Sequence, residues 1–321
     1  NHWLLAWLGL ELNTLSALPM IIKTHHPRAA EATTKYFMIQ ATAAAMILLA
    51  GTVNAWQTGQ WAIANITTIP AIIATTALML KLGLAPLHLW YPQVLQGVTM
   101  NTAMVISTWQ KIAPLTLLYM MHHTLDHTLL LTMGLLSAWV GGWAGLNQTQ
   151  TRTVLAFSSI AHMGWLLTAI ALNPSLTTLT LVLYMTTTIA TFTPTATMTK
   201  TITDMGTTWP MSPPALTTTM ITLMSLGGLP PLTGFMPKWL ILKELSSTGL
   251  TLAATLILLA SLPSLFFYIR LAYLTMLTTP PATTNTEHKW RFKLNLPPYT
   301  TLAITTATLM LPLTMTLYTT T

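Results

Sequence analysis

Long apolar runs separated by short polar connections extend along almost the whole chain. A helix that crosses a membrane needs about 20 mainly apolar residues, so the run lengths predict ten crossings. The predicted helices cover residues 2–22, 33–56, 66–90, 98–121, 127–146, 153–172, 175–200, 214–245, 250–277 and 298–318. We therefore expect an all-α polytopic membrane helix bundle, with residues 1–321 forming a single transmembrane domain.

Two of the predicted helices carry prolines and glycines that interrupt them, in residues 81–92 and 227–239. Proline removes a backbone donor and glycine loosens the turn, so these helices must open there. One interrupted helix in each half is typical of transporters built from inverted repeats. On this pattern the first repeat covers about 2–121 and the second about 127–277, followed by a C-terminal helix at about 298–318.

The composition supports a membrane protein and excludes several other classes. Of the 321 residues, 52% are hydrophobic and 6% charged, whereas soluble domains carry about 25% charged residues. The net charge of +7 is dispersed between apolar segments, so it forms no stripe that could bind nucleic acid. The chain has no cysteine and no glycine-rich, Walker or zinc-protease motif, which argues against thiolate metal sites, iron–sulfur clusters and nucleotide binding.

Basic residues collect in alternate connections, as the positive-inside rule requires of correctly counted helices. One side receives Lys23, Arg28, Lys35, Arg152, Lys200, Lys289, Arg291 and Lys293. The other side receives Lys243 and the group His122, His123, Asp126 and His127. We therefore expect a multi-pass protein with one basic face and a C-terminus on the opposite face.

Four ionisable residues, Glu11, Lys81, Lys111 and Lys238, stand out because each lies inside a long apolar stretch. Charge at membrane depth is costly and usually functional. Each residue also has a plain alternative. Glu11 could be protonated, Lys111 could extend toward the headgroups, and Lys238 could simply bond the carbonyls freed by its helix break.

Lys81 is the partner that we expect for Glu11. Burial disfavours the ammonium form and a nearby carboxylate favours it, so proton binding at Lys81 would follow the opening and closing of the pair. His88 follows the first break and is a candidate relay from Lys81, although a structural role is as probable. We interpret His162 as structural or water-binding, and Glu31 with Lys35 as an ordinary i,i+4 pair.

Six motifs spread over nearly the whole chain resemble the antiporter-like membrane subunits of respiratory complex I. They cover residues 31–37, 81–90, 109–114, 145–150, 155–165 and 226–239. Members of this family often carry Arg-Lys before Ile-Leu-Ala-Tyr-Ser-Ser. Here Arg152 precedes Thr153, and Phe157 replaces the tyrosine, which weakens any role for a basic side chain at position 153.

The resemblance implies a proton-translocating subunit of NADH:ubiquinone reductase in the mitochondrial inner membrane, with its basic loops facing the matrix. Glu11 and Lys81 would form a gating pair, Lys111 would link the halves, and Lys238 would lead toward the exit. It implies no cofactor in this chain, because NAD, FMN, iron–sulfur clusters and ubiquinone bind other subunits. Expected partners are the lipid bilayer and other membrane-arm subunits, including neighbouring antiporter-like ones. A further helix would precede Asn1.

Two rival functions remain open from the residues. A free-standing cation/proton antiporter would use the same broken helices, but would favour more carboxylates than Glu11 alone. A structural membrane subunit would use the buried charges only to satisfy helix breaks.

Overall fold

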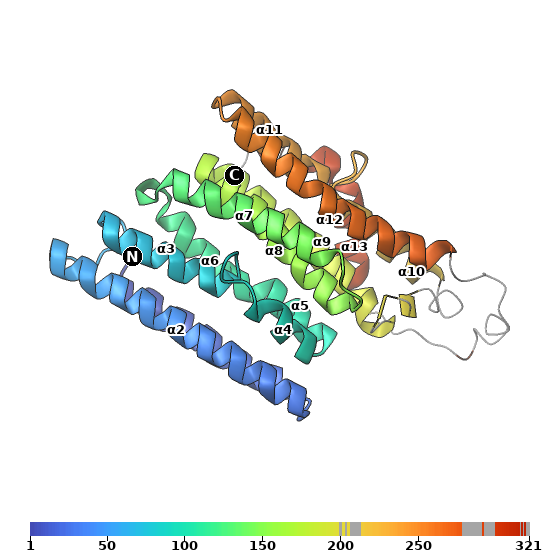
Figure 1. The fold of residues 1–321 in the computed structure, drawn as a ribbon, viewed down its shortest axis with the longest axis horizontal. Coiled ribbons are helices and arrows are strands. Elements are labelled where there is room, and N and C mark those ends of the chain that lie inside the picture. Colours follow the sequence, from blue (N-terminus) through green and yellow to red (C-terminus); the bar gives the residue numbers. More distant parts are fainter. Residues whose placement is uncertain are drawn as a thin grey trace.

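The computed structural model describes residues 1–198, 201–202, 204–205, 213–277, 291, 299–314, 316 and 318. Within these residues the fold is a bundle of helices that lie side by side along one direction (Figure 1). The α-helices are α1 Trp3–Ile22, α2 Pro27–Thr58, α3 Thr68–Leu82, α4 Trp90–Gly97, α5 Met100–Ser107, α6 Trp109–Met120, α7 His127–Gly145, α8 Thr151–Leu172, α9 Pro174–Met198, α10 Pro213–Gly227, α11 Phe235–Ser247, α12 Thr251–Leu277 and α13 Tyr299–Leu309. The predicted all-α membrane fold is confirmed.

The helices make ten passes along the bundle, as the sequence predicts. Six of them, α1, α2, α7, α8, α9 and α12, are each long and apolar enough to cross a membrane. Three further passes are made by two helices in succession, α3 with α4, α5 with α6, and α10 with α11, and the last pass is α13.

Both predicted breaks are present. One separates α3 from α4 and the other separates α10 from α11. Each begins with a glycine in the left-handed region, Gly83 at φ 71° and Gly228 at φ 81°. Residues with a Cβ rarely adopt this conformation, so glycine ends the first half-helix and lets the chain turn away from the helix axis.

A third interruption lies at Thr108, inside the segment predicted as one continuous helix over 98–121. Thr108 separates α5 from α6 and has φ −111° and ψ −71°. Its hydroxyl donates to the Met104 carbonyl at 2.7 Å, and its own N–H donates to the same oxygen at 3.0 Å. A side chain that competes for a backbone carbonyl can disturb a helix without proline or glycine, so the sequence carried no strong signal here.

Helix α8 is the centre of the bundle and is buried along nearly its whole length. It packs most closely against α7, where glycines face each other's backbones. A Cβ on Gly141 would lie 2.6 Å from the Ala161 nitrogen, and one on Gly164 would lie 2.5 Å from the Ser137 hydroxyl. The absence of side chains at these positions therefore sets the short distance between α7 and α8.

Two basic residues of the predicted basic face, Arg28 and Arg152, lie at the same end of the bundle. The Arg152 guanidinium at the start of α8 donates to the Val98 carbonyl, and to the Gln96 carbonyl at 3.2 Å, at the end of α4. A Cβ on Gly97 would lie 2.7 Å from the Arg28 carbonyl, so α2 begins at the same end. The predicted loop residues Lys200, Lys289 and Lys293 lie outside the described residues.

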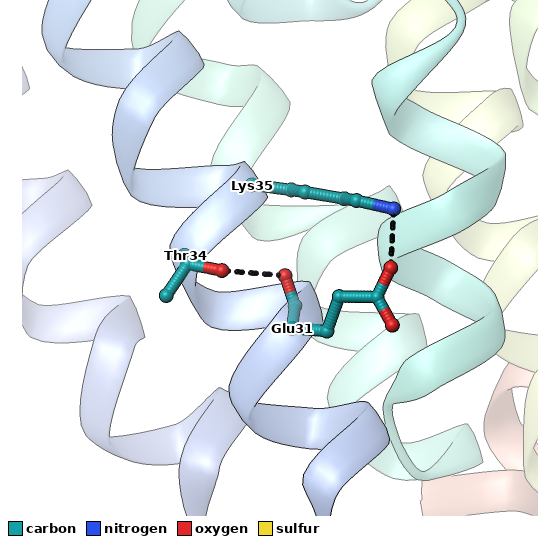
Figure 2. Close-up of polar contacts among 3 residues, drawn as sticks. All are labelled: Glu31, Thr34 and Lys35. Carbon is teal, nitrogen blue, oxygen red and sulfur yellow. Dashed lines mark hydrogen bonds and ion pairs between the residues drawn. The ribbon is translucent and has the colours of Figure 1, made fainter.

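Helix α2 begins at Pro27, six residues before its predicted start. His26 caps it, because its Nδ1 accepts the Arg28 N–H at 3.2 Å, and proline fits the first helical position. Glu31 and Lys35 form the predicted i,i+4 ion pair at 2.6 Å, on an exposed surface (Figure 2). Exposed pairs of this kind contribute little to stability.

Candidate functional site

Three of the described lysines, the buried Lys81 and Lys111 and the half-buried Lys238, lie next to an interruption of a helix. Lys81 is in the last turn of α3, Lys111 in the first turn of α6, and Lys238 in the first turn of α11. The end of a half-helix leaves carbonyls without intrahelical partners and carries a partial negative charge. Each interruption is therefore suited to hold a cation at membrane depth.

Lys238 bonds the end of the half-helix that precedes it. Its Nζ donates to the Gly227 carbonyl at 2.9 Å and to the Leu226 carbonyl at 3.5 Å, and lies 5.9 Å from the centre of the Trp165 ring. A Cβ on Gly228 would lie only 2.9 Å from this Nζ. Glycine at 228 thus serves both the turn and the approach of the ammonium.

Lys111 reaches its interruption through a tyrosine. Its side chain is 3% exposed, and its Nζ donates to the Tyr184 hydroxyl at 3.1 Å. That hydroxyl in turn donates to the Ser107 carbonyl, the last of α5, at 3.0 Å. The Nζ also lies 4.9 Å from the Tyr91 ring centre and 5.2 Å from that of Tyr184, so two aromatic faces stabilise the cation.

Lys81 differs, because its Nζ is buried and bonds no other described residue. The carbonyls at the end of α3 already have partners, since the Trp90 indole donates to Leu80 at 3.2 Å and the Gln40 amide donates to Lys81 at 3.5 Å. An ammonium without a protein partner needs water or a nearby negative charge. Lys81 also lines a small cavity with several polar side chains.

The first cavity is small, and both Lys81 and Lys111 line it. Side chains from α1, α2, α3, α4, α5 and α6 line it, several of them able to bond water. They are Leu10, Asn13, Thr14, Tyr36, Gln40, Lys81, Leu82, Trp90, Tyr91, Ile106, Gln110, Lys111 and Pro114. The first two lysines therefore face one common space.

The second cavity holds Lys238. It is lined by His162, Trp165, Leu166, Thr180, Leu183, Tyr184, Thr187, Ser225, Leu226, Gly234, Pro237, Lys238 and Ile241. The His162 ring lies 5.8 Å from the Tyr184 ring, and its Nε2 is 3.4 Å from the Tyr268 hydroxyl. Because Tyr184 lines this cavity and bonds Lys111, a single hydrogen bond connects the two cavities.

Glu11 does not form the expected direct pair with Lys81. Among the described residues the only ion pair within 4.0 Å is that of Lys35 with Glu31. Glu11 is half-buried on α1, which packs against α2 and α6, and it is not among the residues that line the first cavity. Helix α2, which packs against both α1 and α3, contributes Tyr36 and Gln40 to the wall of this cavity.

His162, and not the expected relay candidate His88, lines one of the two cavities. His88 lines neither cavity, and its ring packs edge-on against Phe157 at 6.5 Å. His162 instead faces the same space as Lys238. Within the described residues, no three His, Cys, Asp or Glu side chains lie close enough to bind a metal ion.

Sequence reasoning missed Tyr184, which makes the only hydrogen bond between the two cavities in the described part of the chain. It lies in the middle of α9, far in sequence from Lys111. A weak signal existed, because Tyr184 is the single tyrosine in the predicted helix over 175–200. Only the packing of α9 against α5 shows what its hydroxyl touches.

Broken helices that carry buried lysines, repeated in both halves of an all-α bundle, define an antiporter-like membrane subunit. Residues 1–264 match the family described as "NADH:quinone oxidoreductase/Mrp antiporter, TM", and the chain belongs to this family. Residues 265–318 match "NADH dehydrogenase subunit 2 C-terminus". The predicted resemblance to antiporter-like subunits is confirmed.

Curated relatives narrow the comparison to one member of that family. NADH-ubiquinone oxidoreductase chain 2 of Carassius auratus is 53% identical over 293 residues, covering 91% of this chain and 84% of the relative. The protein of the same name from Scyliorhinus canicula is 49% identical over 319 residues, covering 98% of this chain and 91% of the relative.

Solved structures agree on the fold. The chain superimposes on a chain of "Respiratory complex I from Thermus thermophilus with bound Aureothin" with a TM-score of 0.82 and 25% identity, covering 99% of this chain and 72% of that one. A chain of the Mrp complex from Dietzia sp. gives a TM-score of 0.80 at 16% identity, covering 89% of this chain and 59% of that one. The second likeness shows the fold alone.

Proposed function

We propose that protons move through this chain along Lys81, Lys111 and Lys238, driven by NADH oxidation in other subunits of NADH:ubiquinone oxidoreductase. The family and the names of the relatives make the chain an antiporter-like, proton-translocating subunit of that complex. The observation that carries the path is the hydrogen bond of 3.1 Å between Lys111 and Tyr184, because it joins the two cavities that hold the other two lysines.

The first transfer takes place in the first cavity. Lys81 and Lys111 face the same space, and its amide and hydroxyl groups can order water between them. When the Glu11 carboxylate moves away or is neutralised, the Lys81 ammonium loses its favourable charge and releases a proton through that water to a neutral Lys111. In this proposal Glu11 controls proton release from Lys81. The structure, in which the two side chains form no direct ion pair, corresponds to the separated state.

The second transfer crosses from one cavity to the other at Tyr184. The Lys111 ammonium donates to the Tyr184 hydroxyl, whose own proton is directed at the Ser107 carbonyl. When the O–H turns from that carbonyl toward the second cavity, the hydroxyl can take up the lysine proton as it releases its own. The released proton enters the second cavity, where the His162 imidazole can accept it and pass it to a neutral Lys238. His88 has no part in this route, because its ring lies against Phe157.

The remaining assignments follow from the family and are part of the same proposal. NAD, FMN, iron–sulfur clusters and ubiquinone bind other subunits, and this chain supplies no redox site. Neighbouring antiporter-like subunits and lipid surround it in the mitochondrial inner membrane. The end that carries Arg28 and Arg152 faces the matrix, as the positive-inside rule predicts. The two repeats cover about 2–121 and 127–277.

Replacing Lys111 with methionine tests the path in the assembled complex reconstituted into vesicles. We expect NADH oxidation to continue while fewer protons are pumped per electron, because the link between the cavities is lost. Lys243→Met is the matched control, since this lysine lies on α11 outside both cavities. An unchanged proton-to-electron ratio in Lys111→Met would contradict the proposal and support a structural role.

Tyr184→Phe is the finer variant, because it keeps the ring and removes only the hydroxyl. A hydrogen bond to a charged group contributes about 1.5–3 kcal/mol, so we expect pumping to slow by about tenfold or more. Broken helices could serve sodium as well as protons, so sodium is the ion to test against. Transport that depends on sodium and persists without the other subunits would favour a free-standing antiporter instead.

A further inference from the structure

We infer that the C-terminal helix α13 positions Lys238, through two buried hydroxyls that hold the α10–α11 break to one carbonyl. The Ser225 hydroxyl donates to the Ala307 carbonyl at 3.0 Å, and the Thr233 hydroxyl donates to the same oxygen at 2.5 Å. All three residues are 0% exposed. This inference rests on the proposed proton path and names Ser225 and Thr233 as positioning residues for it.

The two hydroxyls lie on opposite sides of the break. Ser225 belongs to the last turn of α10, and Thr233 lies in the connection just before α11. The hydroxyls are also 3.2 Å from each other, and the Gly234 N–H donates to the Ser225 hydroxyl at 3.3 Å. The two ends of the break are therefore fastened to each other as well as to α13. We call this group of Ser225, Thr233 and Ala307 the carbonyl clamp.

Ala307 can serve as the shared acceptor because it lies in the last turn of α13. Carbonyls in the last turn of a helix lack their usual intrahelical partners. The helix ends at Leu309, and the following turn, Leu311–Leu313, is a 3-10 helix that contains Pro312. A buried carbonyl there needs donors, and the two hydroxyls supply them.

The clamp acts on the acceptors of Lys238 over a very short distance in the chain. Ser225 directly precedes Leu226 and Gly227, whose carbonyls accept from the Lys238 Nζ. A Cβ on Gly234 would lie only 1.9 Å from the Ser225 carbonyl, so the two sides of the break are in close contact. A movement of α13 would thus displace the carbonyls that hold the ammonium.

Helix α13 lies outside the part of the chain that matches the general antiporter family. The antiporter family match ends at residue 264, and α13 lies within residues 265–318, which match the separate subunit 2 C-terminus. A segment outside the shared antiporter region therefore contacts the second break. The clamp gives this branch of the family a means to set how firmly Lys238 holds its proton.

The test compares Ser225→Ala/Thr233→Val with Thr222→Val in the assembled, reconstituted complex. Thr222 is the matched control, because it is also 0% exposed on α10 but its hydroxyl donates within its own helix, to the Thr219 carbonyl at 2.9 Å. We expect the double variant to lose pumping at lower pH than the wild type, by about one pH unit, because looser carbonyls hold the ammonium less well. The control should keep the wild-type pH profile.

Conservative variants separate positioning from packing. Thr233→Ser and Ser225→Thr keep both hydroxyls and should restore the wild-type profile. Hydrogen exchange at the amides of residues 228–235 should rise in the double variant even if little complex assembles. A wild-type pH profile in the double variant, or an equal shift in Thr222→Val, would overturn the inference. If the inference fails in this way but Lys111→Met still loses pumping, the proposed proton path is retained and only the role of the clamp is rejected.

Discussion

The two glycine-containing breaks hold their lysines in different ways. At the first break the carbonyls at the end of α3 are taken by Trp90 and Gln40, and the Lys81 ammonium faces a cavity without a protein partner. At the second break the Lys238 ammonium itself bonds the end of α10. The difference indicates that backbone carbonyls hold Lys238, whereas no described residue supplies an acceptor to Lys81.

The second break should tolerate a glycine-to-alanine substitution less well than the first break. Gly234→Ala places a Cβ at 1.9 Å from the Ser225 carbonyl. We expect this variant to prevent assembly of the complex, because relief requires the backbone to move, at a cost of roughly 3 kcal/mol or more. Gly83→Ala, where the added Cβ would lie 3.1 Å from the Tyr91 Cβ at φ 71°, should cost about 1–2 kcal/mol and still assemble. Native gels and thermal midpoints measure both, and equal yields would contradict the comparison.

Replacement of Lys81 and replacement of Lys238 should change the thermal stability of the complex by different amounts. Both Lys81→Met and Lys238→Met should reduce pumping. Lys238→Met leaves the Gly227 carbonyl without its donor, so we expect a loss of about 1–3 kcal/mol in stability. Lys81→Met removes a buried charge that bonds no other described residue, so stability should stay the same or rise. The thermal midpoint of the purified complex decides, and equal losses would show that Lys81 is held as firmly as Lys238.

Glu11→Gln should affect the first break alone. The amide keeps the shape of the side chain and removes the carboxylate charge that the proposed mechanism places in control of Lys81. We expect pumping to fall several-fold, about the effect of 1 kcal/mol, with no change in hydrogen exchange around residues 228–235. An unchanged pumping rate would remove Glu11 from the mechanism, while altered exchange at the second break would show that the two breaks are mechanically linked.

The smallest effect is expected at the exposed pair of Glu31 and Lys35. This pair lies at the surface of α2 and outside both lysine cavities. Glu31→Gln should leave pumping and the thermal midpoint unchanged within error, because solvent screens exposed pairs. A loss of pumping there would show that charge at this end of the bundle takes part in proton uptake.

Much of the fold was predictable because a bilayer allows few solutions. The crossing count and both glycine-containing breaks followed from apolar run length and from proline and glycine positions. The interruption at Thr108 was missed because its cause is a side-chain hydroxyl that competes for the Met104 carbonyl. Threonine is abundant in this chain, so this one gave no distinct signal.

The candidate site was predictable residue by residue but not as an arrangement. Glu11, Lys81, Lys111 and Lys238 stand out because an isolated charge in an apolar run is costly. Which of them touch was beyond the sequence, since the contacts join distant segments. Lys111 meets Tyr184 over 73 positions, and Ser225 meets Ala307 over 82.

The sequence by itself determined the environment, the number of passes and the identity of the buried charges, because these follow from the local cost of placing polar groups in lipid. The tertiary structure decided that Glu11 and Lys81 are apart, that His162 rather than His88 faces Lys238, and that α13 closes the second break. Helix packing sets these relations, and the position and rotation of one helix against another depend on side chains from many segments at once.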